Sequence, residues 1–368
     1  MTASYDVVVV GGGPVGAACA RELALEGRRV LVLERGGDIG QGWRAAAGML
    51  APQIESHRDD PLLELGLAAR EHYGPLAAAL AETTGVDIGL WQEGIAAVAA
   101  SDAEVYDLKA RVAWQRQQGH LSDWLDAGEV RARWPWLGET AGALWAAHDG
   151  AIEPEKLVRA LLYDARRAGA VLVEDTVTAI ERVEDRAAAV VAAGGRYPCG
   201  EVVLAAGAWA GQINGLPRPL SVEPVRGQML SFPWPQGVQR AIVYGKGCYI
   251  VARGEEAIVG STMEFAGFQP EVTADGVGRI LAAATALAPV LARSQPQRRW
   301  AGLRPVTPDS LPIIGAEPRL PGLWYATGHG RNGILLAGLT GRLIRQLMAG
   351  EATAEDLRPF SPERFWRW

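Results

Sequence analysis

The stretch YDVVVVGGGPVG, residues 5–16, decides how this chain folds. Its first half contains four consecutive valines, Val7–Val10, which is typical of a strand buried on both faces. The segment AACARELALEG, which follows the glycines, predicts a helix that ends at Gly27, and RRVLVLE predicts a second buried strand that ends at Glu34. Together the three segments predict a βαβ unit, the building block of a parallel sheet.

The glycines of this stretch have the spacing GxGxxG, directly between the strand and the helix. Gly11 allows the tight turn, Gly13 lets a pyrophosphate approach the backbone, and Gly16 lets helix and strand pack closely. The helix N-terminus attracts phosphate charge, and Glu34 can accept hydrogen bonds from ribose hydroxyls. The spacing therefore predicts a dinucleotide site, for either FAD or NAD.

A second glycine loop, GHGRNG at residues 328–333, precedes the helical sequence GILLAGLTGRLIRQLMAG near the other end of the chain. A helix N-terminus carries partial positive charge. Reduced flavin becomes anionic at its N1–C2=O edge, so a helix that begins there would stabilise it, whereas NAD needs no such element. The second loop therefore favours FAD.

The remaining segments predict two domains: one built from the start, middle and end of the chain, and a second, sheet-rich domain inserted between these pieces. Apolar strands at 171–175 and 201–207 continue the parallel sheet, while residues 217–300 alternate like antiparallel strands. Five tryptophans between 114 and 145 indicate packing or subunit contact rather than a substrate cage. The predicted fold class is α/β, with an FAD-binding, Rossmann-like doubly wound domain (1–87, 149–216 and 301–368) and an inserted α+β substrate domain with a mostly antiparallel sheet (88–148 and 217–300).

Composition excludes several other classes of protein. The chain has 368 residues and a net charge of −6, which argues against a general binder of nucleic acid or anionic membranes. Its three cysteines and five histidines are scattered, so we expect neither a disulfide framework nor a metal site. No stretch reaches the roughly 20 apolar residues that a membrane span needs, and no signal peptide is evident. We therefore expect a cytoplasmic protein whose chemistry comes from an organic cofactor.

Several further blocks of sequence resemble one known family. GGGPVGAACARELALEGRRVLVLER, AAAGMLAP (45–52), PVRGQ (224–228), GLRPVTPDSLPIIG (302–315) and GHGRNGILLA together are similar to the D-amino-acid oxidase family of flavoproteins. AAAGML and GRNGILLA resemble most the glycine oxidases of thiazole biosynthesis. The resemblance extends over nearly the whole chain and implies a small amino-acid substrate, oxygen as acceptor, and a homo-oligomer, such as a tetramer.

The resemblance also implies which residues contact FAD. They comprise the fingerprint, the segment after the second strand, one backbone position in the middle of the chain, and the last glycine loop: Gly11, Gly13, Pro14, Val15, Gly16, Glu34, Arg35, Gly42, Trp43, Ala47, Gly48, Met49, Val177, His329, Gly330, Arg331, Asn332, Gly333, Ile334 and Leu335.

Four residues match substrate-contacting positions of the family. Arg304 matches the arginine that holds the substrate carboxylate, Arg331 matches a second contact, and Tyr249 and Met263 match positions that line the substrate pocket. Arginine suits this role because its planar fork pairs with a carboxylate through two hydrogen bonds and so orients the Cα–H bond. We assign catalytic roles to Arg304 and Tyr249, which could close the pocket.

The chain departs from the family pattern at three places. Gly330 stands where a bulkier residue is common, which could widen the site. Trp43 and Arg44 replace small hydroxyl residues, so the pyrophosphate contacts differ. Gly302 stands where the related sarcosine oxidases carry the cysteine that attaches flavin, so we expect FAD to be bound non-covalently.

The expected reaction is oxidation of glycine or of a small N-substituted or D-amino acid to the imine, with reduction of O2 to H2O2. Its expected place is the supply of dehydroglycine for the thiazole of thiamine. Two alternatives stay open. A D-amino-acid dehydrogenase or sarcosine-oxidase-like enzyme would use another acceptor, although no membrane-anchoring amphipathic stretch is evident. A non-catalytic flavin-binding module would have no need of Arg304.

Overall fold

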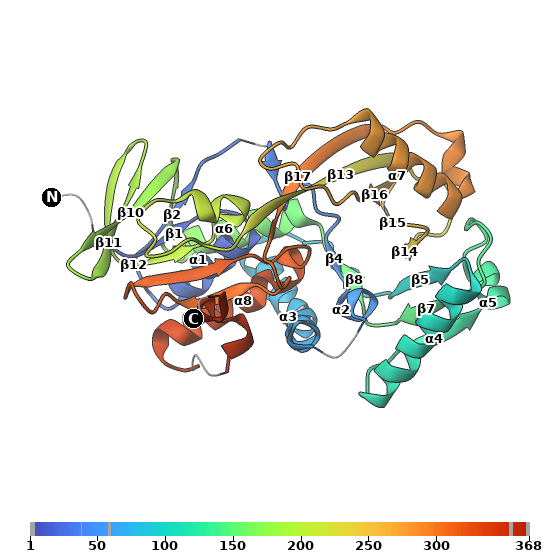
Figure 1. The fold of residues 1–368 in the computed structure, drawn as a ribbon, viewed down its shortest axis with the longest axis horizontal. Coiled ribbons are helices and arrows are strands. Elements are labelled where there is room, and N and C mark those ends of the chain that lie inside the picture. Colours follow the sequence, from blue (N-terminus) through green and yellow to red (C-terminus); the bar gives the residue numbers. More distant parts are fainter. Residues whose placement is uncertain (1–3, 38, 58–59, 353–355, 366–368) are drawn as a thin grey trace.

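The computed structural model describes residues 4–37, 39–57, 60–352 and 356–365, in which two large sheets lie side by side (Figure 1). The first sheet has eight strands in these described residues, with β1 at its centre, paired in parallel with β2 and β12. Its strands are β1 (Tyr5–Val10), β2 (Val30–Glu34), β9 (Val171–Glu174), β10 (Val177–Val183), β11 (Arg186–Ala192), β12 (Gly195–Leu204), β18 (Ile313–Ala316) and β19 (Leu323–Thr327).

The valines of β1 explain why this strand is central. Val7 and Val9 join a buried cluster with residues of the helices α1 (Pro14–Leu25) and α8 (Gly333–Ala349), whereas Val8 and Val10 join the cluster on the opposite face. A strand covered on both faces needs an apolar side chain at every position. The predicted βαβ unit is confirmed, including the end of its helix, where Gly27 has φ +82°.

Two more helices complete this half of the molecule. α6 (Pro154–Arg167) packs against α1, and the long α3 (Pro61–Thr84) packs against α8. α6 begins at Pro154 because a proline suits the first helical position.

The second sheet has nine strands in the described part of the chain and is mostly antiparallel, as predicted. The order is β3-β17-β13-β16-β15-β14-β5-β7-β6, and only the pairs β3–β17 and β14–β5 are parallel. Its strands are β3 (Gly40–Gln41), β5 (Ile95–Ala99), β6 (Asp123–Asp126), β7 (Gly142–Ala146), β13 (Glu223–Pro233), β14 (Ile242–Gly245), β15 (Cys248–Arg253), β16 (Glu256–Gly260) and β17 (Arg298–Val306).

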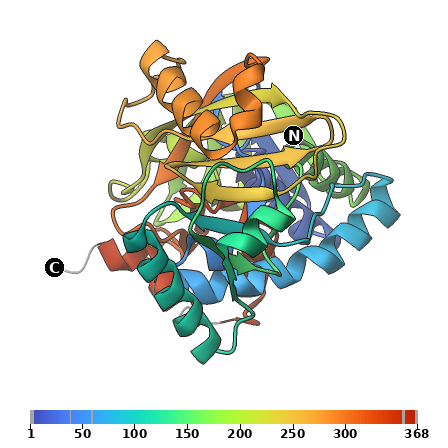
Figure 2. The same cartoon turned by 90° about the vertical axis from the view of Figure 1, so that its right-hand side faces the viewer.

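Helices cover this second sheet, and tryptophans fill the space beneath them. Figure 2, viewed from the side of this sheet, shows α7 (Ala274–Leu287) in orange at the top and α4 (Asp102–Gln117) in teal at the bottom. Trp134 packs against Trp145 with ring centroids 5.4 Å apart, inside a buried cluster that includes residues of α7. α5 (Ala127–Arg133) also packs against β7. Packing is confirmed for Trp134, Trp136 and Trp145, which are buried in this cluster.

Short elements join the two halves. β4 (Met49–Leu50) pairs with β8 (Gly150–Ala151), and α2 (Pro52–Glu55) follows β4 directly. The remaining short helices are η1 (Gly207–Gln212), η2 (Pro289–Arg293), η3 (Arg358–Phe360) and η4 (Pro362–Phe365). In the described ranges, no helix has both the length and the apolar character required to cross a membrane.

At two places the predicted domain limits do not coincide with the limits of the two sheets. β17 crosses the predicted limit at residue 300 because it pairs with β13 from Arg298 to Val306. β3 lies within the first predicted segment, yet it pairs with β17 at the edge of the second sheet. The division into two domains stays a prediction. The sheets differ from its limits at β17, which begins before residue 301, and at β3, which belongs to the second sheet.

Candidate active site

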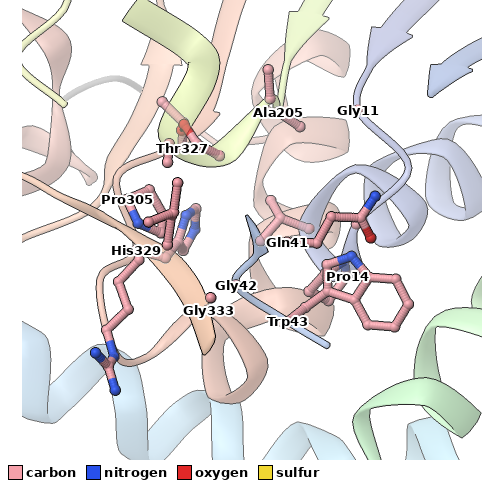
Figure 3. Close-up of a pocket in the computed structure, with 18 of the residues that line it drawn as sticks. Gly11, Pro14, Gln41, Gly42, Trp43, Ala205, Pro305, Thr327, His329 and Gly333 are labelled. Atoms are coloured by element: carbon pink, nitrogen blue, oxygen red, sulfur yellow. The ribbon is translucent and has the colours of Figure 1, made fainter. Parts of the chain in front are cut away.

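A cleft of about 480 Å³ is lined by residues of both sheets. The β1–α1 loop and the β2–β4 segment form one side, while β17 and the loop before α8 form the other. Figure 3 shows Pro14, Gln41 and Trp43 on one side of this space, with Pro305 and His329 across from them. No group of three or more potential metal ligands occurs among the described residues.

The fingerprint loop has the geometry that its glycines predicted. Gly11 has φ +104°, and a Cβ atom there would lie 2.5 Å from the carbonyl oxygen of Ala205. A side chain at Gly16 would collide with the carbonyl oxygen of Gly11, so the helix can approach the strand only because Gly16 has none. Gly11 lines the cleft; Gly16 supports it from beneath and does not line it.

The N-terminus of α1 is open toward the cleft. Gly13 precedes the helix and provides no side-chain cap, and Pro14 occupies the first turn. The free backbone N–H groups of such a terminus bind anions. The indole ring of Trp43 lies beside this turn, because a Cβ atom on Gly13 would be 3.3 Å from it.

Glu34 organises the loop as well as lining the cleft. Its Oε2 accepts a hydrogen bond from the backbone N–H of Gly12 at 2.6 Å, and its Oε1 accepts one from Gln41 Nε2 at 3.2 Å. The next residue, Arg35, stacks its guanidinium on Trp209 at 3.6 Å, and burial lowers the pKa of Arg35. This end of the cleft therefore offers a carboxylate and a flat cation–aromatic wall.

The predicted position Val177 lies at the same end of the cleft, beside Thr176. Asp175 shapes this wall by accepting hydrogen bonds from the backbone N–H groups of Gly194 and Thr176 and from the hydroxyl of Tyr197. The bond from Gly194 is the main cause of the lowered pKa of Asp175.

The loop before α8 closes the opposite side. The backbone N–H of Gly330 donates to the carbonyl of Pro305 at 2.8 Å, and the Nε2 atom of His329 lies 3.0 Å from the hydroxyl oxygen of Thr340. Burial lowers the pKa of His329 to about 3, so its ring is neutral at physiological pH. α8 begins after Asn332 without a side-chain cap, which leaves N–H groups free toward the cleft. A Cβ atom on Gly330 would meet nothing within 4 Å, in keeping with the wider site expected there.

Arg304 comes from β17 and places its guanidinium against Gly227, where any side chain would overlap it. Its Nη2 donates to Ser261 Oγ at 2.7 Å and its Nη1 to the carbonyl of Thr262 at 3.1 Å. Both partners are neutral, and no carboxylate of the described residues forms an ion pair with Arg304. The cleft therefore contains a positioned arginine that forms no ion pair with a carboxylate of the described residues.

Arg331, unlike Arg304, forms an ion pair with a carboxylate. Its Nη2 donates to Oε1 of Glu55 at 3.0 Å, and the hydroxyl of Tyr244 donates to the same oxygen at 2.7 Å. Glu55 is the main cause of the raised pKa of Arg331. Tyr249 lies beside this group, with its ring centroid 5.5 Å from that of Tyr244, and burial raises the pKa of Tyr249.

The cleft brings together most of the predicted site residues. Those that line it are Gly11, Gly13, Pro14, Val15, Glu34, Arg35, Gly42, Trp43, Ala47, Gly48, Met49, Val177, Tyr249, Arg304, His329, Gly330, Arg331, Asn332, Gly333 and Ile334. Their individual roles stay predictions.

Three predicted residues lie outside the lining. Gly16 packs beneath the loop, and Leu335 is 2% exposed in the core beside α3. Met263 is the third: its side chain is 52% exposed, so the structure does not place it in the substrate pocket as the resemblance implied. The preceding residue, Thr262, turns inward and accepts a hydrogen bond from the backbone N–H of Gln228.

Sequence reasoning missed several lining residues, among them Gln41, Glu55, Trp209 and Ser261. Gln41 and Glu55 stand close to predicted residues, and a polar side chain beside a cofactor motif was the available signal. Trp209 and Ser261 follow strands without any motif and reach the cleft only through the tertiary fold.

Gly302 stands at the position of the flavin-attaching cysteine in related enzymes, and the structure leaves little room there for a side chain. A Cβ atom there would lie 2.6 Å from Cβ of Ala45 and 3.0 Å from the carbonyl oxygen of Gln41. A cysteine could not be accommodated at this position without a shift of the β3 segment.

Comparison with known proteins shows similarity to FAD-dependent oxidoreductases over nearly the full length of the chain. A model of the DAO family, described as FAD dependent oxidoreductase, matches residues 6–347. The chain is 39% identical to a glycine oxidase of Geobacillus kaustophilus over 99% of this chain and 98% of the relative. It is 36% identical to the bifunctional protein ThiO/ThiG of Synechocystis over 99% of this chain, but spans only 55% of that relative.

Solved structures with a similar fold cover nearly the whole chain. The crystal structure of the glycine oxidase from Geobacillus kaustophilus matches with a TM-score of 0.93 at 38% identity, covering 99% of both chains. That of an iminodiacetate oxidase from Chelativorans sp. BNC1 matches with a TM-score of 0.87 at 27% identity, covering 97% of this chain and 98% of the other.

FAD, the cofactor in the family's description, fits the residues present. The uncapped N-terminus of α1 suits its pyrophosphate, and Glu34 suits a ribose hydroxyl. The uncapped N-terminus of α8 suits the edge of the flavin that gains negative charge on reduction. These two helix termini lie on the wall of one continuous cleft.

Proposed function

The chain belongs to the family of FAD-dependent oxidoreductases, and on that premise we propose that it oxidises glycine and small N-substituted or D-amino acids. The product is the imine, which water converts to the 2-oxo acid and ammonia or an amine. Oxygen is the proposed acceptor and is reduced to H2O2.

One observation carries this proposal: Arg304 is a part-buried cation that forms no ion pair with a carboxylate of the described residues, and it lies in the same cleft as the two uncapped helix termini. Burial is the main cause of its lowered pKa, which means that its charge lacks the hydration it would have in water. An incoming carboxylate would supply the missing partner through a two-pronged hydrogen bond. The site therefore suits a substrate with one carboxylate next to the reacting carbon.

The side chains of this protein bind and orient the substrate rather than attack it. Arg304 fixes the carboxylate, and its own position is fixed by Ser261 and Thr262, so the α-carbon faces one direction. Bound FAD supplies the acceptor for the hydride from that carbon. His329 is bonded to Thr340 and Glu55 to Arg331, so we assign no general base and expect the amine to lose its proton as it binds.

Similarity to glycine oxidases and to ThiO/ThiG proteins supports glycine as a substrate and a place in thiamine synthesis. Supply of dehydroglycine for the thiazole ring is the proposed role. The cytoplasmic location and the homo-oligomer, such as a tetramer, stay predictions.

The test is peroxide production by the purified yellow protein with glycine, sarcosine, D-alanine and D-proline. We expect peroxide with glycine, in amounts that match the oxygen consumed. Reduction of an artificial dye without oxygen uptake would instead support a dehydrogenase. A flavin that none of the four amino acids reduces would support a non-catalytic module.

A further inference from the structure

Arg331 lines the cleft, but Glu55 already neutralises it. The ion pair joins Nη2 of Arg331 to Oε1 of Glu55 at 3.0 Å, and the Glu55 side chain is only 17% exposed. Tyr244 strengthens the arrangement, because its hydroxyl donates to the same carboxylate oxygen and lies 2.9 Å from the sulfur of Met49. Glu55 is therefore a held, inward-facing anion in the substrate part of the cleft.

The ion pair between Arg331 and Glu55 lies close enough to Arg304 to affect the pKa of Arg304. Among the causes that act on the pKa of Arg304, burial is the largest, while Arg331 lowers it and Glu55 raises it. Two arginines therefore face the same part of the cleft. In the described part of the chain Arg331 has an ion-pair partner in Glu55, whereas Arg304 forms no ion pair with a carboxylate. The protein thus provides for one substrate carboxylate rather than two.

We propose that Glu55 is a specificity-determining residue that restricts the enzyme to amino acids with a single carboxylate, because it occupies Arg331. The inference rests on the proposed function and names the substrate class more narrowly. A second carboxylate near Arg331 would meet the negative charge of Glu55 and find its counterion already bound. Like-charge contacts of this kind are a common way for a site to reject the wrong ligand.

The first arm of the test measures binding without turnover. Methoxyacetate has one carboxylate and oxydiacetate has two, and neither carries an amine that could be oxidised. Their dissociation constants are measured from changes in the flavin spectrum of the FAD-bound protein and of its Glu55→Gln variant. We expect the natural protein to prefer methoxyacetate and the variant to shift this preference toward oxydiacetate by about 10- to 100-fold, the range of one charge-assisted hydrogen bond.

The second arm measures reaction. Iminodiacetate is compared with its monoamide, which has the same shape but one carboxylate, through anaerobic reduction of the flavin. Glu55→Gln should raise the efficiency for iminodiacetate relative to the monoamide. Glu55→Asp, which keeps the charge, should shift this ratio far less. The double variant Glu55→Gln/Arg331→Gln should lose the gain, because the freed arginine is what receives the second carboxylate.

Two results would overturn the inference: unchanged preferences in Glu55→Gln in both arms, or a gain that persists in the double variant. A failure of the proposed function looks different, since glycine would then fail to reduce the flavin of the natural protein. The ligand-binding arm needs no turnover and so remains informative in that case.

Discussion

At the scale of single residues, the account depends most on Arg304. Arg304→Lys keeps the positive charge but not the planar fork, so the substrate binds with its Cα–H bond poorly directed. We expect the variant to retain FAD and its flavin to be reduced by glycine about 100-fold more slowly, the size of effect that misplacement by about 1 Å produces. Stopped-flow reduction at several glycine concentrations separates this loss of rate from a loss of affinity.

The matched control for Arg304→Lys is Arg298→Lys, at an exposed arginine of the same strand that pairs with Glu256. This control should reduce its flavin at the natural rate. If Arg304→Lys or Arg304→Ala did so too, the carboxylate assignment would be wrong, and Arg331 would become the candidate.

Residue roles were only partly predictable from the sequence. Gly11, Gly13 and Glu34 belong to a motif whose spacing has a direct geometric meaning, so their place at the cleft could be predicted. The role of Glu55 could not, because its place near a predicted cofactor segment is a weak signal, and only the fold brings Arg331 to it. Met263 shows the converse, since the resemblance placed it in the pocket but the fold leaves it exposed and outside the cleft lining.

At the scale of elements, the four-residue helix α2 is held in place by a buried carboxylate. Asp149 is 0% exposed and accepts hydrogen bonds from the backbone N–H groups of Gln53 and Ile54, and it pairs with Arg70 at 2.8 Å. We expect Asp149→Asn to lower the free energy of unfolding by about 3 kcal/mol, because the buried Arg70 loses its buried counterion and keeps only the exposed Glu71. Urea denaturation measures this loss.

Asp185→Asn, at a fully exposed aspartate, provides the control and should change stability by less than about 0.5 kcal/mol. Equal stability of the two variants would show that Asp149 does not anchor α2.

The loop before α8 makes stability depend on pH through His329. Burial lowers its folded-state pKa from 6.5 to about 3, so the unfolded chain takes up a proton below pH 6.5 while the folded protein does not. Stability from this group is therefore complete above pH 6.5 and is lost as pH falls, by about 1.4 kcal/mol per pH unit at most. His329→Gln should show a shallower loss of unfolding free energy between pH 6.5 and 4.5 than the natural protein. Parallel slopes for the two proteins would contradict this role.

The βαβ unit of the first sheet was predictable because its parts have strong local patterns: two strands of apolar residues, a glycine loop and a helix that ends near a glycine. The strand order of the second sheet was not. β13 lies between β16 and β17, and β14 pairs with β5, which is far away in sequence. Such pairings depend on how distant apolar faces fit together, and no short stretch of sequence records them.

At the scale of the whole molecule, one cleft with walls from both sheets predicts that FAD stabilises the entire protein. With FAD at about 100 times its dissociation constant, the gain is about 2.7 kcal/mol, or roughly 3 °C in melting temperature for a chain of this size. Riboflavin, which lacks the pyrophosphate and adenosine, should give a much smaller shift. Melting curves of the FAD-free protein with each compound measure this difference.

The same bound FAD should appear in the supernatant after acid precipitation, because the crowding at Gly302 leaves no room for a covalent link there. Flavin retained in the protein pellet would refute non-covalent binding.

The central claim is that the chain directs electrons from the α-carbon of glycine into its bound FAD, with Arg304 holding the carboxylate. Anaerobic mixing of the FAD-bound protein with glycine, followed by the visible absorbance of the flavin, tests it most directly. The account predicts bleaching at a rate that saturates with glycine concentration and that falls sharply in Arg304→Ala. A flavin that stays oxidised in saturating glycine, yet is still reduced by dithionite, would contradict it.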